Sequence, residues 1–590
     1  MGKLGATSTN PTAVMIDLAA AGAGGVVNGP QDRFDWDAID WRAQYEQVRR
    51  LRQRIFKATQ AGDLKQARNL QKLMLRSRAN TLVSVRQATA RNTGRRTPGV
   101  DGQVALTSRA RADLAVRLHR HGPAHALPVR RVYIPKKGGQ RPLGIPVIAD
   151  RAQQHRVRNA LEPEWEARLD PKQYGFRPGR GCHDAIVMIH RALAVKHAKR
   201  QWILDADLAS AFDRIDHNFL LDRLGSFPAR EQIRAWLKAG VVDHGRYVPT
   251  VEGASQGGPL SPLLLNITLQ GMEEAAGVRY NTYGHVRPGC PTVITYADDL
   301  VALCHSRSQA ETVREKISGW LTERGLTLNQ GKSEIRHVDD GFDFLSYTIR
   351  RYRNQRGTII LTTPSRDAMA KIRNRLTAEL RTLQGASPAA VIGKLNPIIR
   401  GQANYYRPGA SKRAYQALDH YLCQRLYQWA LRRHPTKGRR WVKHRYFGSY
   451  HPARRNQWVF GDRDTGAYLH HYAWTPIVRH IPVAGRNSPD DPALAQYWAD
   501  RRRRHPPPHL AETWTRRLRN QHGLCPECGQ PLPDADRPPD TPTQWETWYA
   551  DLRHTVIYQT TTRGNRTTHR LVHTDCARSH PGDRTQPPDE

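Results

Sequence analysis

The sequence lacks any hydrophobic run long enough to cross a bilayer, and it has few cysteines and few acidic residues. A membrane-spanning helix needs about 18 or more apolar residues in a row, so we expect no such span. Only seven Cys occur in 590 residues, with one close pair at Cys525 and Cys528. This usage argues against a disulfide-stabilised secreted protein. It favours a reduced, cytoplasmic protein with a possible metal site.

The shortage of acidic residues has the strongest consequence. There are 92 Lys and Arg against 53 Asp and Glu, which gives a formal net charge of +39, and only 17 of the cations are Lys. A GC-rich genome would favour Arg over Lys, but it would not create the excess over acids. We therefore expect a polyanionic partner, and nucleic acid above all.

Length and local pattern predict several domains rather than one. Apolar positions recur at helical spacing in 41–90 and 366–433, whereas short β-rich runs alternate with helical runs between 130 and 365. We expect a multidomain α+β protein with a flexible tail at 1–30, a basic helical extension at 31–95, an α+β core at 96–365, a helical domain at 366–447, a nucleic-acid-binding segment and linker at 448–515, and a Cys/His module at 516–590.

Three acidic residues stand out by their context. Asp298 and Asp299 lie where the chain must turn between two apolar runs, 292–296 and 300–304, and Asp207 follows a third apolar run. If these strands are neighbours in one sheet, the carboxylates meet at its edge. Desolvated carboxylates repel each other unless a cation is present, and such a group can hold two Mg²⁺ for phosphoryl transfer. The alternative is an acidic turn that faces solvent.

The blocks around these acids resemble motifs of reverse transcriptases. Residues 296–299, Tyr-Ala-Asp-Asp, are similar to the YxDD box, and Asp207 with Phe212 matches the first palm motif. Five more blocks follow the order of that family: VYIPKKGGQRPLGIP at 132–146, QYGFRPGRGCHDAI at 173–186, ASQGGPLSPLLLNI at 254–267, GLTLNQGKSEI at 325–335 and FDFLSYTIR at 342–350. The resemblance implies a right-hand polymerase with fingers and palm over 96–365. It also implies that Asp207, Asp298 and Asp299 are the catalytic, Mg²⁺-binding triad.

The flanking blocks resemble group II intron-encoded proteins. LRQRIFKAT precedes the fingers, and LNPIIRGQANYYR at 395–407 and RRHPTKGRRWVKHRYF at 432–447 are similar to the thumb, or maturase, domain of that family. The resemblance extends over about residues 35 to 590. It implies a reverse transcriptase and maturase in the bacterial cytosol or nucleoid. Such a protein binds its intron RNA, assists splicing and reverse splicing into target DNA, and copies the RNA from dNTPs into cDNA.

Two other functions remain open at this point. One is a domesticated reverse transcriptase that acts on another RNA, and its palm would look the same. The other is a splicing cofactor with a relic polymerase. The intact acidic triad argues against a relic, because a relic would be free to lose these residues.

The resemblance also implies nucleotide-binding residues. Lys136 and Arg141 lie on a Gly-containing finger turn, where cations can clamp a triphosphate; the alternative is a solvated basic turn. Gln256 precedes two glycines that permit close backbone approach to the nascent base pair. Lys332 could give a proton to the leaving pyrophosphate. Phe212 matches the family's gate against a ribose 2′-OH, although an aromatic residue there could equally be core.

Intron RNA binding is expected from the basic N-terminal helices and from residues 395–447. Tyr405 and Tyr406 lie between Arg400 and Arg407, so their rings could stack on bases while the cations hold phosphates. For each Tyr alone, packing in the core is an equal alternative.

Two residue pairs predict a zinc site near the C-terminus. Cys525 with Cys528 and His573 with Cys576 have the same i, i+3 spacing, and four such ligands suit tetrahedral Zn²⁺. The alternative is an incidental pair of cysteines.

The segment around these ligands resembles the ββα HNH endonuclease that ends many proteins of the family. That motif places a His after the last Cys, but Ala577 stands there, and Thr568 stands near the position of the motif's Asn. His554 and His580 remain as possible endonuclease residues. We expect the zinc scaffold to be kept and the nuclease centre to be damaged.

Overall fold

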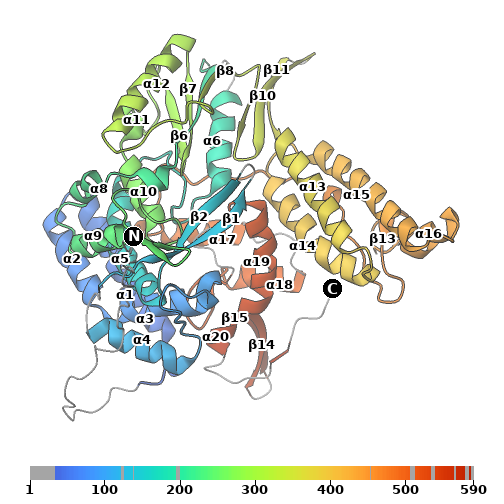
Figure 1. The fold of residues 1–590 in the computed structure, drawn as a ribbon, viewed down its shortest axis with the longest axis horizontal. Coiled ribbons are helices and arrows are strands. Elements are labelled where there is room, and N and C mark those ends of the chain that lie inside the picture. The colour runs from blue at the N-terminus through green and yellow to red at the C-terminus, as the bar shows by residue number, and fades with distance from the viewer. Residues whose placement is uncertain are drawn as a thin grey trace, which may run out of the picture.

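The computed structural model describes residues 34–585 except 121–124, 137–138, 195–198, 356, 452, 505–511, 533–538, 564–565 and 578–583. The tail expected at 1–30 lies outside these residues. Figure 1 shows the N-terminal helices on one side of the molecule and the helices of residues 366–446 on the other, with β-sheets between and above them.

The N-terminal helices pack against one long central helix. They are α1 (Trp41–Gln60), α2 (Leu64–Arg76), α3 (Arg78–Arg86) and α4 (Ser108–Arg120), and the central helix is α5 (Ile148–Arg168). Two short turns, η1 (Gln87–Arg91) and η2 (Thr93–Arg96), follow α3. The side chains of Asp40, Asp63 and Ser77 accept backbone N–H groups at the starts of α1, α2 and α3, which satisfies donors that a helix terminus leaves unpaired.

A small four-stranded sheet has the order β2-β1-β4-β5. Its strands are β1 (Val129–Lys136), β2 (Gly139–Ile145), β4 (Val241–Asp243) and β5 (Arg246–Val248). β1 and β2 form an antiparallel hairpin, and β4 runs parallel to β1. Helices α7 (Ala211–Arg214), α8 (His217–Leu224) and α9 (Arg230–Lys238) lead from strand β3 into this sheet.

The central sheet has the order β6-β7-β3-β8, and its neighbouring strands are antiparallel. The strands are β3 (Trp202–Asp207), β6 (Thr292–Tyr296), β7 (Asp299–Cys304) and β8 (Glu334–His337). Helix α12 (Arg307–Thr322) contacts β3 and β7, whereas α6 (Cys182–Ala194) contacts β6. Helices α10 (Ser261–Leu269) and α11 (Met272–Ala275) precede β6.

A three-stranded sheet connects this centre to four helices. The strands are β9 (Phe342–Phe344), β10 (Tyr347–Asn354) and β11 (Gly357–Pro364), and the helices are α13 (Arg366–Thr382), α14 (Pro388–Tyr406), α15 (Lys412–Arg433) and α16 (Arg439–Tyr446). The block FDFLSYTIR at 342–350 forms β9 and the first half of β10. Leu345 and Ser346 turn the chain with φ of 47° and 68°, and Phe344 pairs with Tyr347 across the turn.

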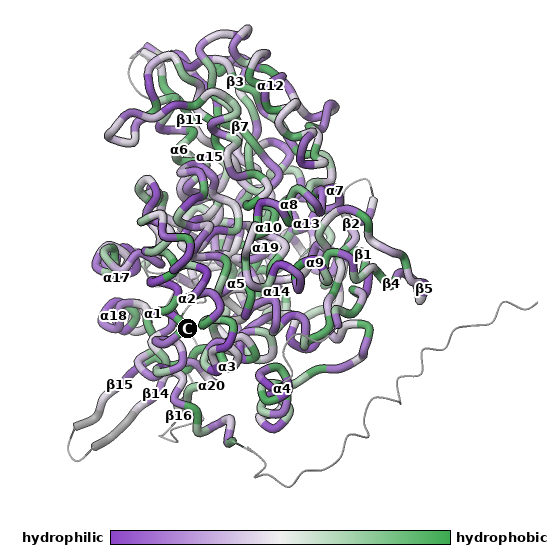
Figure 2. Tube along the Cα trace, turned by 90° about the vertical axis from the view of Figure 1, so that its left-hand side faces the viewer, coloured by the Kyte–Doolittle hydropathy of each residue, from purple (hydrophilic) through white to green (hydrophobic). Residues whose placement is uncertain are grey.

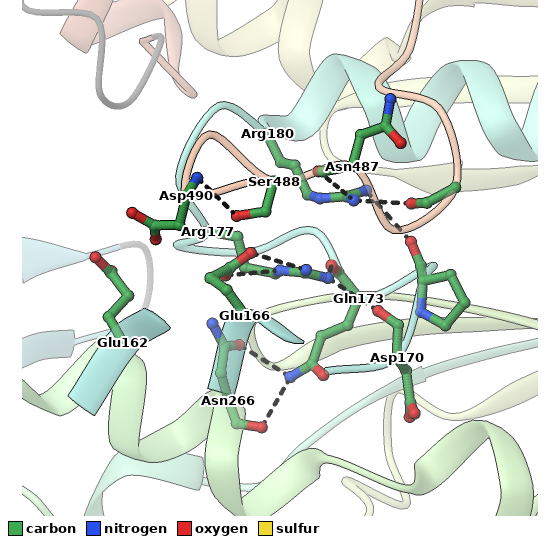
Figure 3. Close-up of polar contacts among 12 residues, drawn as sticks. Glu162, Glu166, Asp170, Gln173, Arg177, Arg180, Asn266, Asn487, Ser488 and Asp490 are labelled. Atoms are coloured by element: carbon green, nitrogen blue, oxygen red, sulfur yellow. Dashed lines mark hydrogen bonds and ion pairs between the residues drawn. The ribbon is translucent and has the colours of Figure 1, made fainter. Parts of the chain in front are cut away.

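Residues 447–520 contain β12 (Phe447–Gly448), β13 (Val459–Phe460), η3 (Tyr472–Trp474), η4 (Pro492–Leu494), α17 (Ala495–Arg504) and α18 (Glu512–Asn520). Beyond β13, the described residues of 461–520 lead from α16 back toward the N-terminal helices. The Arg52 guanidinium of α1 donates to both carboxylate oxygens of Asp490, at 2.8 and 2.7 Å. Arg180 donates to the carbonyls of Gly485 and Asn487 at 2.8 and 3.1 Å (Figure 3). Residues 485–490 of the segment predicted to include a linker are therefore packed onto the protein.

The C-terminal part contains α19 (Pro542–Thr555), β14 (Val556–Arg563), β15 (Arg566–His573), α20 (Thr574–Ala577) and β16 (Arg584–Thr585). Figure 1 shows α19 beside α14, and the two helices are in extensive contact. Figure 2 shows β14 and β15 projecting as a hairpin, with α17 and α18 on an outer side in mostly hydrophilic colours. No helix among the described residues is long and apolar enough to cross a membrane.

Candidate active site and metal centre

The three predicted acids lie together at one end of the central sheet. β6 and β7 form a hairpin with a two-residue loop, Ala297 and Asp298, and Asp299 begins β7. Asp207, the last residue of β3, pairs with Asp299 across the two strands. The N–H of Leu208 donates to the carbonyl of Asp298 at 2.9 Å, which ties the loop to the end of β3.

The electrostatics of this end favour a bound cation. Burial, then the charges of Asp298 and Asp207, raise the pKa of Asp299 to about 7. Burial also raises the pKa of Asp205 to about 7. The Lys332 Nζ donates to Asp207 Oδ2 at 2.5 Å, and this hydrogen bond raises the pKa of the lysine. Neighbouring carboxylates supply the oxygen donors that Mg²⁺ prefers, so the types of residue gathered at this end suit that ion.

The finger loop at 173–176 holds the hairpin from the side. The N–H of Tyr174 donates to the carbonyl of Thr295 at 2.9 Å. At Gly175 an added Cβ would lie 2.3 Å from the backbone nitrogen of Ala297, so only glycine lets the two backbones approach this closely. No role for Gly175 was expected from the sequence. Its only signal was its place inside a recognised block.

Phe212 lies in an aromatic group beside the acids. Its ring is half-buried and meets the ring of Phe176 edge to face, with centroids 6.2 Å apart. Phe176 also lies 6.5 Å from the ring of Tyr296. The carbonyl of Phe212 accepts the N–H of Ala254 at 2.6 Å. These aromatic neighbours are compatible with a gate against the ribose 2′-OH and with a core position. The gate role of Phe212 therefore remains a prediction.

The predicted nucleotide contacts come from the finger hairpin and the loop after Ala254. Arg141 is exposed on β2, and its charge, with that of a neighbouring arginine, opposes the rise that burial causes in the pKa of Asp213. The backbone of Lys136 ends β1, and its side chain lies outside the described residues. The carbonyl of Gln256 accepts the N–H of Gly144 at 2.6 Å, which joins this loop to β2.

The two predicted RNA-stacking tyrosines are buried. Tyr405 and Tyr406 are 3% and 2% exposed, and their rings pack against each other and against Tyr347. The Tyr405 hydroxyl donates to a backbone carbonyl at 2.6 Å. Neither ring presents a face to a base, so the stacking prediction does not fit and the core alternative does. Arg400 and Arg407, at the same end of α14, are half-buried.

The four predicted zinc ligands form a buried cluster. The candidate ligand atoms of Cys525, Cys528, His573 and Cys576 all lie within 4.8 Å of one another. The Nε2 of His573 lies 3.0 Å from the carbonyl of Pro531, and donation to that carbonyl makes Nδ1 the acceptor nitrogen of the ring. This Nδ1 lies 3.4 Å from Cys528 Sγ. Four soft or borderline donors with an oriented histidine fit a tetrahedral Zn²⁺.

The predicted endonuclease residues are only partly described. His554 is exposed near the end of α19, and its carbonyl accepts the hydroxyl of Thr574 at 3.2 Å. His580 lies outside the described residues. The β14–β15 hairpin followed by the one-turn helix α20 has the ββα order that the HNH resemblance implied. This order alone does not identify a nuclease.

Three family models match consecutive parts of the chain. The N-terminal domain of reverse transcriptase matches residues 36–118, reverse transcriptase (RNA-dependent DNA polymerase) matches 134–349, and the group II intron maturase-specific domain matches 368–447. The reverse transcriptase match contains all three acids of the central sheet.

Curated relatives agree with these matches. Protein YkfC of Escherichia coli (strain K12) is 33% identical over 333 residues, which cover 50% of this chain and 87% of YkfC. The group II intron-encoded protein LtrA of Lactococcus lactis subsp. cremoris is 34% identical over 302 residues, which cover 41% of this chain and 49% of LtrA. Maturase-like protein 1 of Euglena gracilis is 24% identical over 62% of this chain and 76% of its own length. The polymerase and maturase domains and these relatives show that the chain belongs to the family of group II intron reverse transcriptases and maturases.

Proposed function

We propose that Asp207, Asp298 and Asp299 hold two Mg²⁺ ions and that this site copies a group II intron RNA into cDNA during retromobility. The observation that carries the proposal is the pairing of Asp207 with Asp299 beside the Asp298 loop, because it gathers the three carboxylates at one end of two adjacent strands. When bound, the ions would activate a primer 3′-hydroxyl and neutralise charge on the leaving pyrophosphate.

The protein's own residues would orient and protonate the reactants. Lys332 already bonds to Asp207, and its raised pKa keeps a proton on Nζ that could pass to pyrophosphate. Arg141 and Lys136 would bind the triphosphate from the finger hairpin. The Phe212 ring would fill the space that a ribose 2′-OH needs, and the backbone after Gln256 would support the nascent base pair.

The nucleic-acid partners follow from the maturase domain and the charge. We propose that intron RNA binds the basic faces of the N-terminal helices and of residues 395–447, and that the same ribonucleoprotein contacts target DNA. The net charge of +39 supports these partners. Arg400 and Arg407 remain candidates, with their contact made through cations rather than through tyrosine stacking. With such partners, we propose that the protein works in the bacterial cytosol or nucleoid.

We propose a structural role for zinc in the Cys/His cluster and little or no endonuclease activity. The four ligands are gathered and buried, which supports metal-dependent folding. A nuclease centre would need a second metal and a general base, and Ala577 supplies no ligand where the family's motif has a His. DNA synthesis would then start from a primer that this module does not cut.

Replacement of one acid tests the polymerase assignment. Asp298→Ala should abolish primer extension and leave intron RNA binding within a few fold, because the acid contributes to metal binding and not to RNA affinity. Asp340→Asn is the matched control, since Asp340 belongs to another Asp-Asp pair and is exposed. Normal extension by Asp298→Ala would refute the assignment of these carboxylates. Splicing should survive the substitution, because the RNA is the ribozyme.

A further inference from the structure

The Cys/His cluster lies directly against the N-terminal helices, far away in sequence. Arg86, the last residue of α3, donates through Nε to Asp575 Oδ2 at 2.8 Å and through Nη2 to Cys576 Sγ at 3.1 Å. Arg91, at the end of η1, places Nη2 3.5 Å from Cys528 Sγ and 3.3 Å from His573 Nδ1. Two arginines of the N-terminal helices thus contact three of the four candidate zinc ligands.

An unusual helical turn makes this double contact possible. Residues 87–91 form a π-helix, and the N–H of Asn92 bonds to the carbonyl of Gln87 five residues earlier, at 2.9 Å. In a π turn, residues five apart are rotated less relative to each other than in an α-helix, where they point to different sides. Arg86 and Arg91 are five apart, so the π turn aligns both guanidinium groups toward the cluster.

Burial makes these arginines costly unless negative charge balances them. Arg86 is 1% exposed, and its guanidinium lies 4.2 Å from the ring centroid of Trp41. Arg91 is half-buried, and its guanidinium lies 5.3 Å from the ring centroid of Tyr45. Buried guanidinium groups need anionic partners. Asp575 provides one negative charge. A Zn²⁺ held by three thiolates and a neutral histidine provides a second, because three negative charges exceed the ion's two.

The opposite side of the C-terminal part is fixed to the helices of residues 366–446. The Glu546 carboxylate of α19 accepts both terminal nitrogens of Arg375, on α13, at 2.7 Å each. At Gly401 of α14 an added Cβ would lie 2.4 Å from Glu546 Cγ and 2.8 Å from its backbone nitrogen, so the glycine permits close packing. The C-terminal part therefore contacts both the N-terminal helices and the helices of residues 366–446.

We infer that Arg86 and Arg91 are positioning residues for the zinc cluster, and that the loaded cluster works as an electrostatic clamp between the C-terminal module and the N-terminal helices. The inference rests on the zinc site proposed above. It makes the module a part of the polymerase body rather than an independent nuclease. Zinc loss should loosen α1 and α3 as well as residues 516–585.

The test uses the full-length protein with zinc bound. Arg91→Gln should release zinc to a chelator more easily, with an affinity lower by roughly 10–100-fold, as for other groups that bond to metal ligands. Arg91→Lys should recover part of the loss because it keeps the charge. Arg109→Gln is the matched control, since Arg109 is an exposed cation on α4, and it should bind zinc as the wild type does.

A spectroscopic measurement separates this role from a general packing role. In the cobalt-substituted protein, loss of an N–H···S hydrogen bond should shift the thiolate-to-cobalt charge-transfer band of Arg91→Gln to lower energy. Hydrogen exchange after zinc removal should rise in α1 and α3 of the wild type. This exchange measurement uses the wild type alone, so it tests the clamp even if the variants fail to fold.

The outcomes distinguish the two proposals. A wild-type protein that holds no stoichiometric zinc would overturn both the zinc site and the clamp. A wild-type protein that holds zinc, with Arg91→Gln unchanged in affinity and band position, would overturn the clamp alone. So would exchange that rises only within 516–585 when zinc is removed.

Discussion

Replacement of Gly175 by alanine should damage catalysis without removing any polar group. The added Cβ would lie 2.3 Å from the nitrogen of Ala297, 3.0 Å from its Cα and 3.1 Å from the carbonyl carbon of Tyr296. All three atoms are backbone, so no flexible side chain can move aside. The hairpin that carries Asp298 must shift by about an ångström, and misplacement of that size costs roughly 100-fold in rate. Overpacking should also cost about 1–3 kcal/mol of stability.

Primer extension at saturating dNTP and thermal unfolding of the same samples measure the two effects. Gly319→Ala is the matched control, because Gly319 lies within α12 and an added Cβ would meet no atom within 4 Å. It should keep full activity and gain up to about 1 kcal/mol from helix propensity. Gly175→Ala with an extension rate within twofold of wild type would show that the finger loop does not set the position of the acids.

Three further predictions concern selectivity, charge and the C-terminal module. Phe212→Ala should raise ribonucleotide incorporation roughly tenfold, about 1.4 kcal/mol of lost discrimination, and unchanged selectivity in competition assays would assign the ring to the core. Affinity for intron RNA should fall steeply with salt, since about six neutralised phosphates give a log–log slope near −4 for single strands; a flat titration would attribute the charge to genome composition. A target duplex incubated with Mg²⁺ should show little bottom-strand nicking, and strong nicking that His554→Ala abolishes would prove the nuclease centre intact.

The acidic hairpin could be predicted from sequence because its signal is local. Two apolar runs flank Asp298 and Asp299, so the turn between them is fixed by the runs themselves. The pairing with Asp207 needed one more assumption, that the two segments are neighbours in one sheet, and the sheet order β7-β3 now shows this. The family resemblance supplied the same assumption independently.

The tyrosines of α14 show where a local pattern is ambiguous. Tyrosines next to arginines are typical of an RNA-binding surface, but neighbouring residues of a helix point only about 100° apart, so two in a row can both face the core. Tyr405 and Tyr406 both became core because the hydroxyl and ring of Tyr347 occupy the space beside them. That partner lies on β10, and nothing in the spacing of α14 indicates it.

The contacts between the C-terminal residues and the N-terminal helices could not be predicted from the spacing of residues in the sequence. Arg52 and Asp490 are 438 residues apart, and Arg86 and Asp575 are 489 residues apart. Each arginine had ordinary alternatives as a solvent-exposed or RNA-binding cation. Only the folded chain distinguishes a cation that is buried against a carboxylate from one that is left for a phosphate.

The packing of the central sheet explains why such distant segments can matter for catalysis. Along β7, Leu300 and Ala302 belong to the hydrophobic core that includes the N-terminal helices, and Val301 and Leu303 belong to the core that includes α13 to α15. Alternate residues of a strand point to opposite faces, so the sheet is held between two cores. The first core also contains Leu571 and Cys576 of the C-terminal Cys/His module. The Cys/His module therefore shares a core with β7, the strand that begins at Asp299. Because protein interiors are close-packed, a small displacement of the module can be transmitted to that strand.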